Sequence, residues 1–179
     1  RYINNIYFDT PFFHSYFENV EGIRDRMKFR IRWYGDLFGR IEKPVLEIKI
    51  KKGLVGYKKS FALLPFVFDV HFTFDRFVTH LSDSKVPQEV VENFKTIRPV
   101  LLNSYRRIYF EEAEKMFRIT VDDKLVYRRI ENNNNLFFDS HHEDEKIVFE
   151  LKYNNEYDNK ADQVVSYFPF RLTKNSKFV

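Results

Sequence analysis

Three basic side chains occupy alternate positions of the segment 27–34: Lys28, Arg30 and Arg32. The positions between them are apolar, and alternation with a period of two is typical of a strand with two different faces. At a rise of about 3.3 Å per residue, neighbouring cations on this face stand about 7 Å apart and repel one another unless water or an anion screens them. The segment therefore predicts a cationic strand face that meets either bulk solvent or a polyanion.

The same one-sided charge recurs in later segments of the chain. Arginine binds phosphate through two parallel hydrogen bonds, whereas a lone carboxylate among cations suits a divalent metal that bridges phosphate oxygens. An ordinary antiparallel sheet also turns charges of both signs toward water, so a solvated outer face is the alternative. The charged residues that share one face of these segments are Glu47, Lys49, Lys51, Lys58, Arg107, Arg118, Asp122 and Glu150.

The strands that carry these residues come from alternating or aromatic-rich stretches. Alternation predicts an α+β fold with about seven strands, at 3–9, 24–34, 44–51, 57–63, 97–110, 116–126 and 147–153. Helical spacing predicts helices at 12–20, 66–81, 87–96 and 159–167. We expect the stretch 132–135 to be a polar loop and 141–146 to be exposed. Such strands form either an open sheet with a wet polar face or a closed barrel that turns this face inward around a ligand.

Composition limits the class of protein. The chain has 179 residues, of which 44% are hydrophobic, 31% charged and 18% aromatic, and its net charge is +4. These values predict one globular domain over residues 1–179, and the absence of cysteine excludes disulfides and thiolate metal sites. We expect a cytoplasmic protein without a membrane-spanning segment. The chain starts inside a strand pattern without an initiator methionine, so we expect an excised domain that lacks part of its sheet upstream.

An ordered set of short motifs resembles the VTC domain, the polyphosphate polymerase branch of the CYTH-like triphosphate tunnel metalloenzymes. The resemblance spans nearly the whole chain, and it is the order of the motifs that makes it specific. The motifs are Tyr7-Phe-Asp-Thr10, Lys28-Phe-Arg-Ile-Arg-Trp-Tyr-Gly35, Leu46-Glu-Ile-Lys49, Tyr105-Arg-Arg107, Phe117-Arg-Ile-Thr-Val-Asp122, Phe149-Glu-Leu-Lys152 and Lys174-Asn-Ser-Lys177-Phe.

The resemblance implies an antiparallel β-barrel tunnel with a few peripheral helices, whose first strand is missing here. It implies transfer of the terminal phosphate of ATP or another nucleoside triphosphate onto a polyphosphate chain. It further implies that Glu150, and after it Glu47, binds Mn²⁺ or Mg²⁺. The implied catalytic residues are Arg30, Arg32, Lys49, Arg107, Arg118 and Lys177. The implied phosphate contacts are Lys28, Arg30, Arg32, Lys49, Lys58, Arg107, Arg118, Lys174, Ser176 and Lys177.

Three other functions stay open at this point. A triphosphate hydrolase of the same fold begins with a Glu-x-Glu-x-Lys strand, whereas this chain offers only Glu47-x-Lys49 and Glu150-x-Lys152. A non-catalytic binder of polyphosphate or inositol phosphates needs the same cations. A nucleic-acid module would place aromatic rings on the basic face, so we expect no nucleic-acid partner. A membrane partner or domain in the full-length context is also compatible with the sequence.

Overall fold

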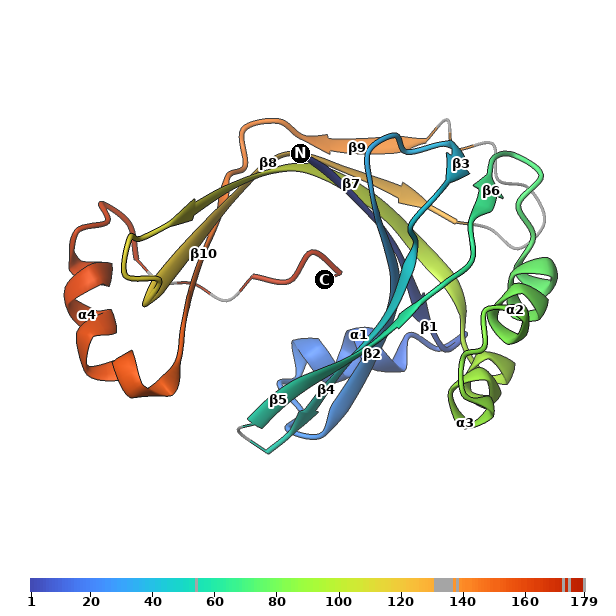
Figure 1. Ribbon diagram of the computed structural model, residues 1–179, viewed down its shortest axis with the longest axis horizontal. Coiled ribbons are helices and arrows are strands. Elements are labelled where there is room, and N and C mark those ends of the chain that lie inside the picture. The colour runs from blue at the N-terminus through green and yellow to red at the C-terminus, as the bar shows by residue number, and fades with distance from the viewer. Residues whose placement is uncertain (54, 131–136, 138, 172, 174, 179) are drawn as a thin grey trace.

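The computed structural model describes residues 1–53, 55–130, 137, 139–171, 173 and 175–178. Its main element is one curved antiparallel sheet of eight strands in the order β10-β8-β7-β1-β2-β4-β5, with β9 paired to β8 (Figure 1). A small second sheet pairs β3 with β6. The strands are β1 (Tyr2–Asp9), β2 (Arg26–Tyr34), β3 (Gly39–Ile41), β4 (Val45–Lys52), β5 (Val55–Ala62), β6 (Phe66–Phe68), β7 (Arg98–Glu111), β8 (Phe117–Arg129), β9 (Ser140–Glu143) and β10 (Val148–Tyr153).

The convex face of this sheet carries the main hydrophobic core. Helix α2 (Phe74–Asp83), helix α3 (Gln88–Val91) and the 3₁₀ helix η1 (Glu92–Lys95) lie on this side (Figure 1). Phe8 of β1 stacks with Phe77 of α2 at 5.9 Å between ring centroids and meets Phe94 of η1 edge-on at 5.1 Å. Trp33 is buried here, as its alternation with the cations predicts. Because these rings are buried in the convex core, the apolar side of β2 faces the convex side, and its cations lie on the concave face.

The concave face is polar, apart from a small cluster of Ile3, Tyr105, Leu125 and Val148. Helix α1 (His14–Val20) lies near one end of this face, and the C-terminal segment reaches into it (Figure 1). Asp9, which is fully buried, accepts hydrogen bonds from the backbone amides of Ser15 and Tyr16 at 2.9 and 3.0 Å and so fixes the start of α1. The 3₁₀ helix η2 (Asn155–Tyr157) and helix α4 (Asp158–Ser166) follow β10.

The antiparallel strands and short helices agree with the sequence, but the expected closed barrel is not seen. Among the described residues, β10 and β5 are the two edges of an open, curved sheet. The expected helix 66–81 is also wrong in its first part, where 66–68 forms β6. Ile41 of β3 pairs with Phe66 of β6, so strand pairing overrides the weak helical spacing there. The segment 141–146 is largely exposed, as expected, but its first three residues belong to β9. The expected loop 132–135 lies outside the described residues.

Among the described residues, none of the helices has both the length and the apolar composition needed to cross a bilayer.

Candidate functional site

Three lysines form a row across neighbouring strands on the concave face. Lys28 of β2 pairs in register with Lys49 of β4, which pairs with Lys58 of β5. Residues directly opposite each other in a sheet have Cβ atoms about 5 Å apart, and like charges in this position are destabilising. The row is therefore kept at a cost to stability, which an anion bound over it would offset.

The electrostatics of the row match this geometry. The pKa of Lys28 is lowered to about 8, first by burial and then by the neighbouring charges of Arg26 and Lys49. Burial and the charge of Arg30 also lower the pKa of Lys49, whose side chain is still exposed to solvent. Both lysines would gain stabilisation of their charged form from a nearby anion, because a negative charge opposes both of these effects.

Beside the row, Glu47 of β4 contacts three basic side chains of the concave face, of which one, Lys58, belongs to the row. Its Oε2 accepts from Nε of Arg30 at 2.7 Å, its Oε1 accepts from Nζ of Lys58 at 2.6 Å, and Nη1 of Arg32 lies 3.7 Å away. The carboxylate is only 6% exposed. Burial would raise its pKa, but the charges of Arg30 and Arg32 and the bond from Lys58 lower it to about 2. Glu47 is thus a permanently charged anchor for these side chains.

Two further contacts orient the arginines of β2. Nη1 of Arg30 donates to the hydroxyl of Tyr7 at 3.3 Å, and Nε of Arg32 donates to Oδ1 of Asn5 at 3.1 Å. Asn5 in turn donates to Asn103 of β7 at 2.9 Å. Polar residues of β1 and β7 therefore position the guanidinium groups, which lose less conformational entropy when they bind an anion.

A second carboxylate anchors cations on the other half of the concave face. Asp122 of β8 is fully buried and accepts from Nε and Nη2 of Arg107 at 2.5 and 2.6 Å. Its Oδ2 also lies 2.6 Å from Nζ of Lys177, which comes from the C-terminal segment. Burial would raise the pKa of Asp122, but the hydrogen bonds from Arg107 and Lys177 lower it. The pairing joins the C-terminal segment to β8, the strand next to the edge strand β10.

Glu150 of β10 is the more accessible of the two predicted metal ligands. Its side chain is 43% exposed, with Nη2 of Arg107 at 3.7 Å and Nζ of Lys152 at 3.5 Å. Both oxygens of Glu47, by contrast, already bind cations. Among the described residues, no group of three or more histidine, aspartate or glutamate side chains could hold a metal ion. Because Mg²⁺ commonly binds one or two carboxylates plus substrate phosphates, Glu150 fits a metal that the substrate helps to hold.

The structure brings most of the predicted residues to this one face. Ser176 accepts from Nζ of Lys28 at 3.3 Å, and Lys177 reaches Asp122. Arg118 of β8 is exposed and pairs in register with Lys152 of β10, two residues along the strands from the pair of Thr120 and Glu150. Lys174 lies outside the described residues. The predicted phosphate contacts therefore extend from β5 to β8, with Glu47 and Asp122 as anchors among them, and the predicted metal ligand Glu150 lies on β10.

Sequence reasoning assigned no role in the site to Asn5, Tyr7, Asn103 and Phe178, and it did not predict that Asp122 anchors cations. The alternation of β1 could have indicated Asn5 and Tyr7, which register with Arg32 and Arg30. Nothing in the pattern ties Phe178 to Tyr7, because their contact joins the two ends of the chain. Tyr7 also places an aromatic ring on the basic face, whereas the sequence predicts aromatic rings mostly on the opposite face.

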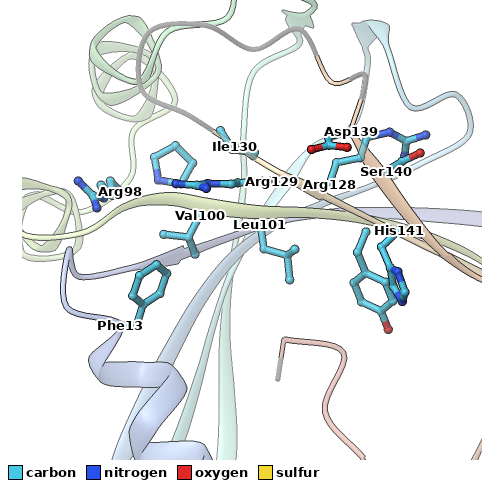
Figure 2. A pocket seen from close by; sticks show the side chains of 12 residues that line it. Phe13, Arg98, Val100, Leu101, Arg128, Arg129, Ile130, Asp139, Ser140 and His141 are labelled. Carbon is cyan, nitrogen blue, oxygen red and sulfur yellow. The ribbon is translucent and has the colours of Figure 1, made fainter.

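A separate cavity of about 1010 Å³ lies at the ends of β7, β8 and β9. Arg98, Arg128 and His141 are among its lining residues, but none of the predicted site residues lines it. Figure 2 shows Arg98 and Arg128 pointing away from each other, so these cations do not converge on one ligand position. We therefore place the candidate site on the concave face and not in this cavity.

Comparison with known proteins agrees with the motifs distributed over this face. A family model described as the VTC domain matches residues 1–179, which is the entire chain. None of the curated proteins compared with the chain matches it. The match covers every strand that contributes to the lysine row and to the two carboxylate anchors. The chain belongs to the VTC domain family.

Proposed function

We propose that this chain is the catalytic domain of a metal-dependent polyphosphate polymerase. In this proposal the concave face is the inner wall of a triphosphate tunnel, and it binds both the nucleoside triphosphate and the growing polyphosphate. The row of Lys28, Lys49 and Lys58 is the observation that carries the proposal. Three lysines side by side, two of them with lowered pKa values, suit a ligand that carries several negative charges close together.

The chain's own residues would act by placement and by charge neutralisation. Phosphoryl transfer depends on in-line positioning and on stabilising charge on the transferred group, more than on covalent chemistry by the protein. Arg30 and Lys58 are held by Glu47, and Arg107 and Lys177 by Asp122, so their remaining N–H groups are directed before the substrate arrives. Donors fixed in advance stabilise developing charge without a reorganisation cost.

A general base is not required for this reaction. The attacking group would be a terminal phosphate oxygen, which is already deprotonated at neutral pH, whereas a hydrolase must orient and deprotonate water. Glu150 would hold the divalent ion, which when bound neutralises phosphate charge and orients the triphosphate. This acceptor chemistry is the physical reason to favour a polymerase over a hydrolase.

The direct test is to incubate the protein with ATP and Mn²⁺ and to separate the products on a polyacrylamide gel. We expect a ladder of long polyphosphate. Free phosphate as the sole product would indicate a hydrolase, and no product at all would indicate a binder. The Glu150→Gln variant is the matched control, since it keeps the side-chain shape and removes the charge expected to hold the metal.

A non-catalytic binder is the second candidate, because the described cations serve binding equally well. The accessible carboxylate of Glu150 separates the two functions. A protein that only binds anions gains nothing from a half-exposed carboxylate beside Arg107 and Lys152, since this carboxylate repels an anionic ligand. Its presence is the specific reason to place the polymerase first.

A further inference from the structure

The C-terminal segment 175–178 is fastened to the concave face by contacts with four strands. Lys177 pairs with Asp122 of β8, and its backbone carbonyl accepts from Nδ2 of Asn103 of β7 at 2.9 Å. Ser176 accepts from Lys28 of β2. The ring of Phe178 stacks on Tyr7 of β1, with 5.1 Å between centroids and 28° between planes. These contacts define one bound position for a segment that has no regular secondary structure.

Phe178 is the one apolar side chain among these contacts. It is 8% exposed, although it is next to the last residue of the chain. Nζ of Lys28 lies 5.5 Å from its ring centroid, and its backbone N–H donates to Oγ of Ser176 at 3.4 Å. Tyr7, on which it stacks, accepts from Arg30. The ring therefore touches or adjoins three of the groups proposed to bind phosphate.

The surroundings of Lys28 show what this ring does to the site. Its ammonium donates to Oδ1 of Asn19 of α1 at 2.7 Å and to Ser176, and the Phe178 ring covers a further side. The charged groups that face it are Arg26 and Arg30 of β2, Lys49 of β4 and Asp9 of β1. Three of these four are cations. The ring thus excludes water from a lysine that repulsion already disfavours in its charged form.

We propose that Phe178 is a positioning residue: by stacking on Tyr7 it seats the C-terminal segment so that Ser176, Lys177 and Lys28 face a common phosphate group. The proposal rests on the proposed function for the identity of that ligand. Phe178 itself makes no contact with phosphate in this scheme. Its role is to hold the donors of the terminus against β2 and to keep Lys28 poorly hydrated until an anion arrives.

The test compares Phe178→Ala with Phe170→Ala, a matched loss of another aromatic ring near the C terminus. Phe170 packs against Phe149, with centroids 5.0 Å apart, on the side of β10 opposite to Glu150. Phe178→Leu is the conservative variant, since it keeps an apolar cover without a ring. Thermal unfolding first establishes that all three variants are folded.

The first readout is the pH titration of Lys28, which is monitored by NMR in the absence of any ligand. In wild type we expect a pKa of about 8. In Phe178→Ala the pKa rises toward the ordinary lysine value of about 10.4, because hydration of the ammonium outweighs the loss of its cation–π contact with the ring. Phe178→Leu and Phe170→Ala keep the wild-type value. A pKa of Lys28 that is unchanged in Phe178→Ala would overturn the proposal, and a simple loss of stability would not produce the rise.

The second readout is the affinity for polyphosphate at pH 7, measured by calorimetry. Phe178→Ala should weaken binding by about tenfold, the effect of losing a stacked aromatic contact. Phe170→Ala should bind as wild type does, and an equal loss in both variants would contradict a specific role for Phe178. If wild type itself does not bind polyphosphate, the proposed function fails, and the titration of Lys28 still decides the positioning role.

Discussion

Replacement of Glu47 by glutamine tests whether this carboxylate holds the cations of β2 and β5 in place. The substitution keeps the size of the side chain and removes one charge that Arg30 and Lys58 share. Lowering the pKa of Glu47 from 4.5 to about 2 corresponds to about 3 kcal/mol of stabilisation at neutral pH. For a domain of this size, such a loss lowers the melting temperature by about 6–12 °C.

The same pKa fixes how the effect depends on pH. A carboxylate whose pKa is depressed on folding contributes stability above its unfolded value, and this contribution is lost as pH falls through the folded value. The wild type should therefore lose its advantage over Glu47→Gln between pH 4.5 and about 2. Denaturant unfolding of both proteins at pH 7 and at pH 3 measures this difference directly.

Glu42→Gln is the matched control for this experiment. Glu42 also pairs with an arginine, Arg40, at 2.7 Å, but its side chain is 62% exposed. Exposed pairs contribute about 0–1 kcal/mol, so this variant should be nearly as stable as wild type. Equal stability of Glu47→Gln and wild type at pH 7 would refute the anchoring role. Loss of Mn²⁺ binding in Glu47→Gln without loss of stability would instead support Glu47 as a metal ligand.

Three further predictions concern the ligand. Glu150→Gln should abolish turnover with ATP and Mn²⁺ without lowering the polyphosphate affinity measured by calorimetry; normal turnover would make the metal assignment wrong. Arg30→Ala should weaken polyphosphate binding at low salt far more than at high salt, as lost phosphate contacts do. Polyphosphate affinity should fall as pH rises through about 8, because Lys28 then loses its charge. Lys28→Met should remove this alkaline decrease, and its persistence would assign the titration to another group.

The alternation of polar and apolar residues was sufficient to predict the long strands and the face on which the cations of β2 lie. Trp33 is buried and Lys28, Arg30 and Arg32 face the concave side, since a shift by one residue would have exposed the core. Short elements were harder to predict. The strand at 66–68 exists through its pairing with β3, and that long-range contact leaves no local pattern.

The chemical roles within the site were less accessible from sequence than its location. Parity places Glu47 and Glu150 on the same face and cannot distinguish them. The structure does, because Glu47 is enclosed by three cations whereas Glu150 keeps an accessible carboxylate. The contact of Phe178 with Tyr7 depends on the path of the chain terminus, which no strand periodicity encodes.

The central claim is that the lysine row of the concave face binds polyphosphate, and salt dependence tests it most directly. Binding of a defined-length polyphosphate is measured at several salt concentrations for wild type and for Lys28→Met, Lys49→Met and Lys58→Met. We predict tight binding by wild type, with about one fewer counter-ion released on binding for each lysine removed. The claim would be contradicted if wild type does not bind polyphosphate. It would also be contradicted if all three variants bind with the same salt dependence as wild type.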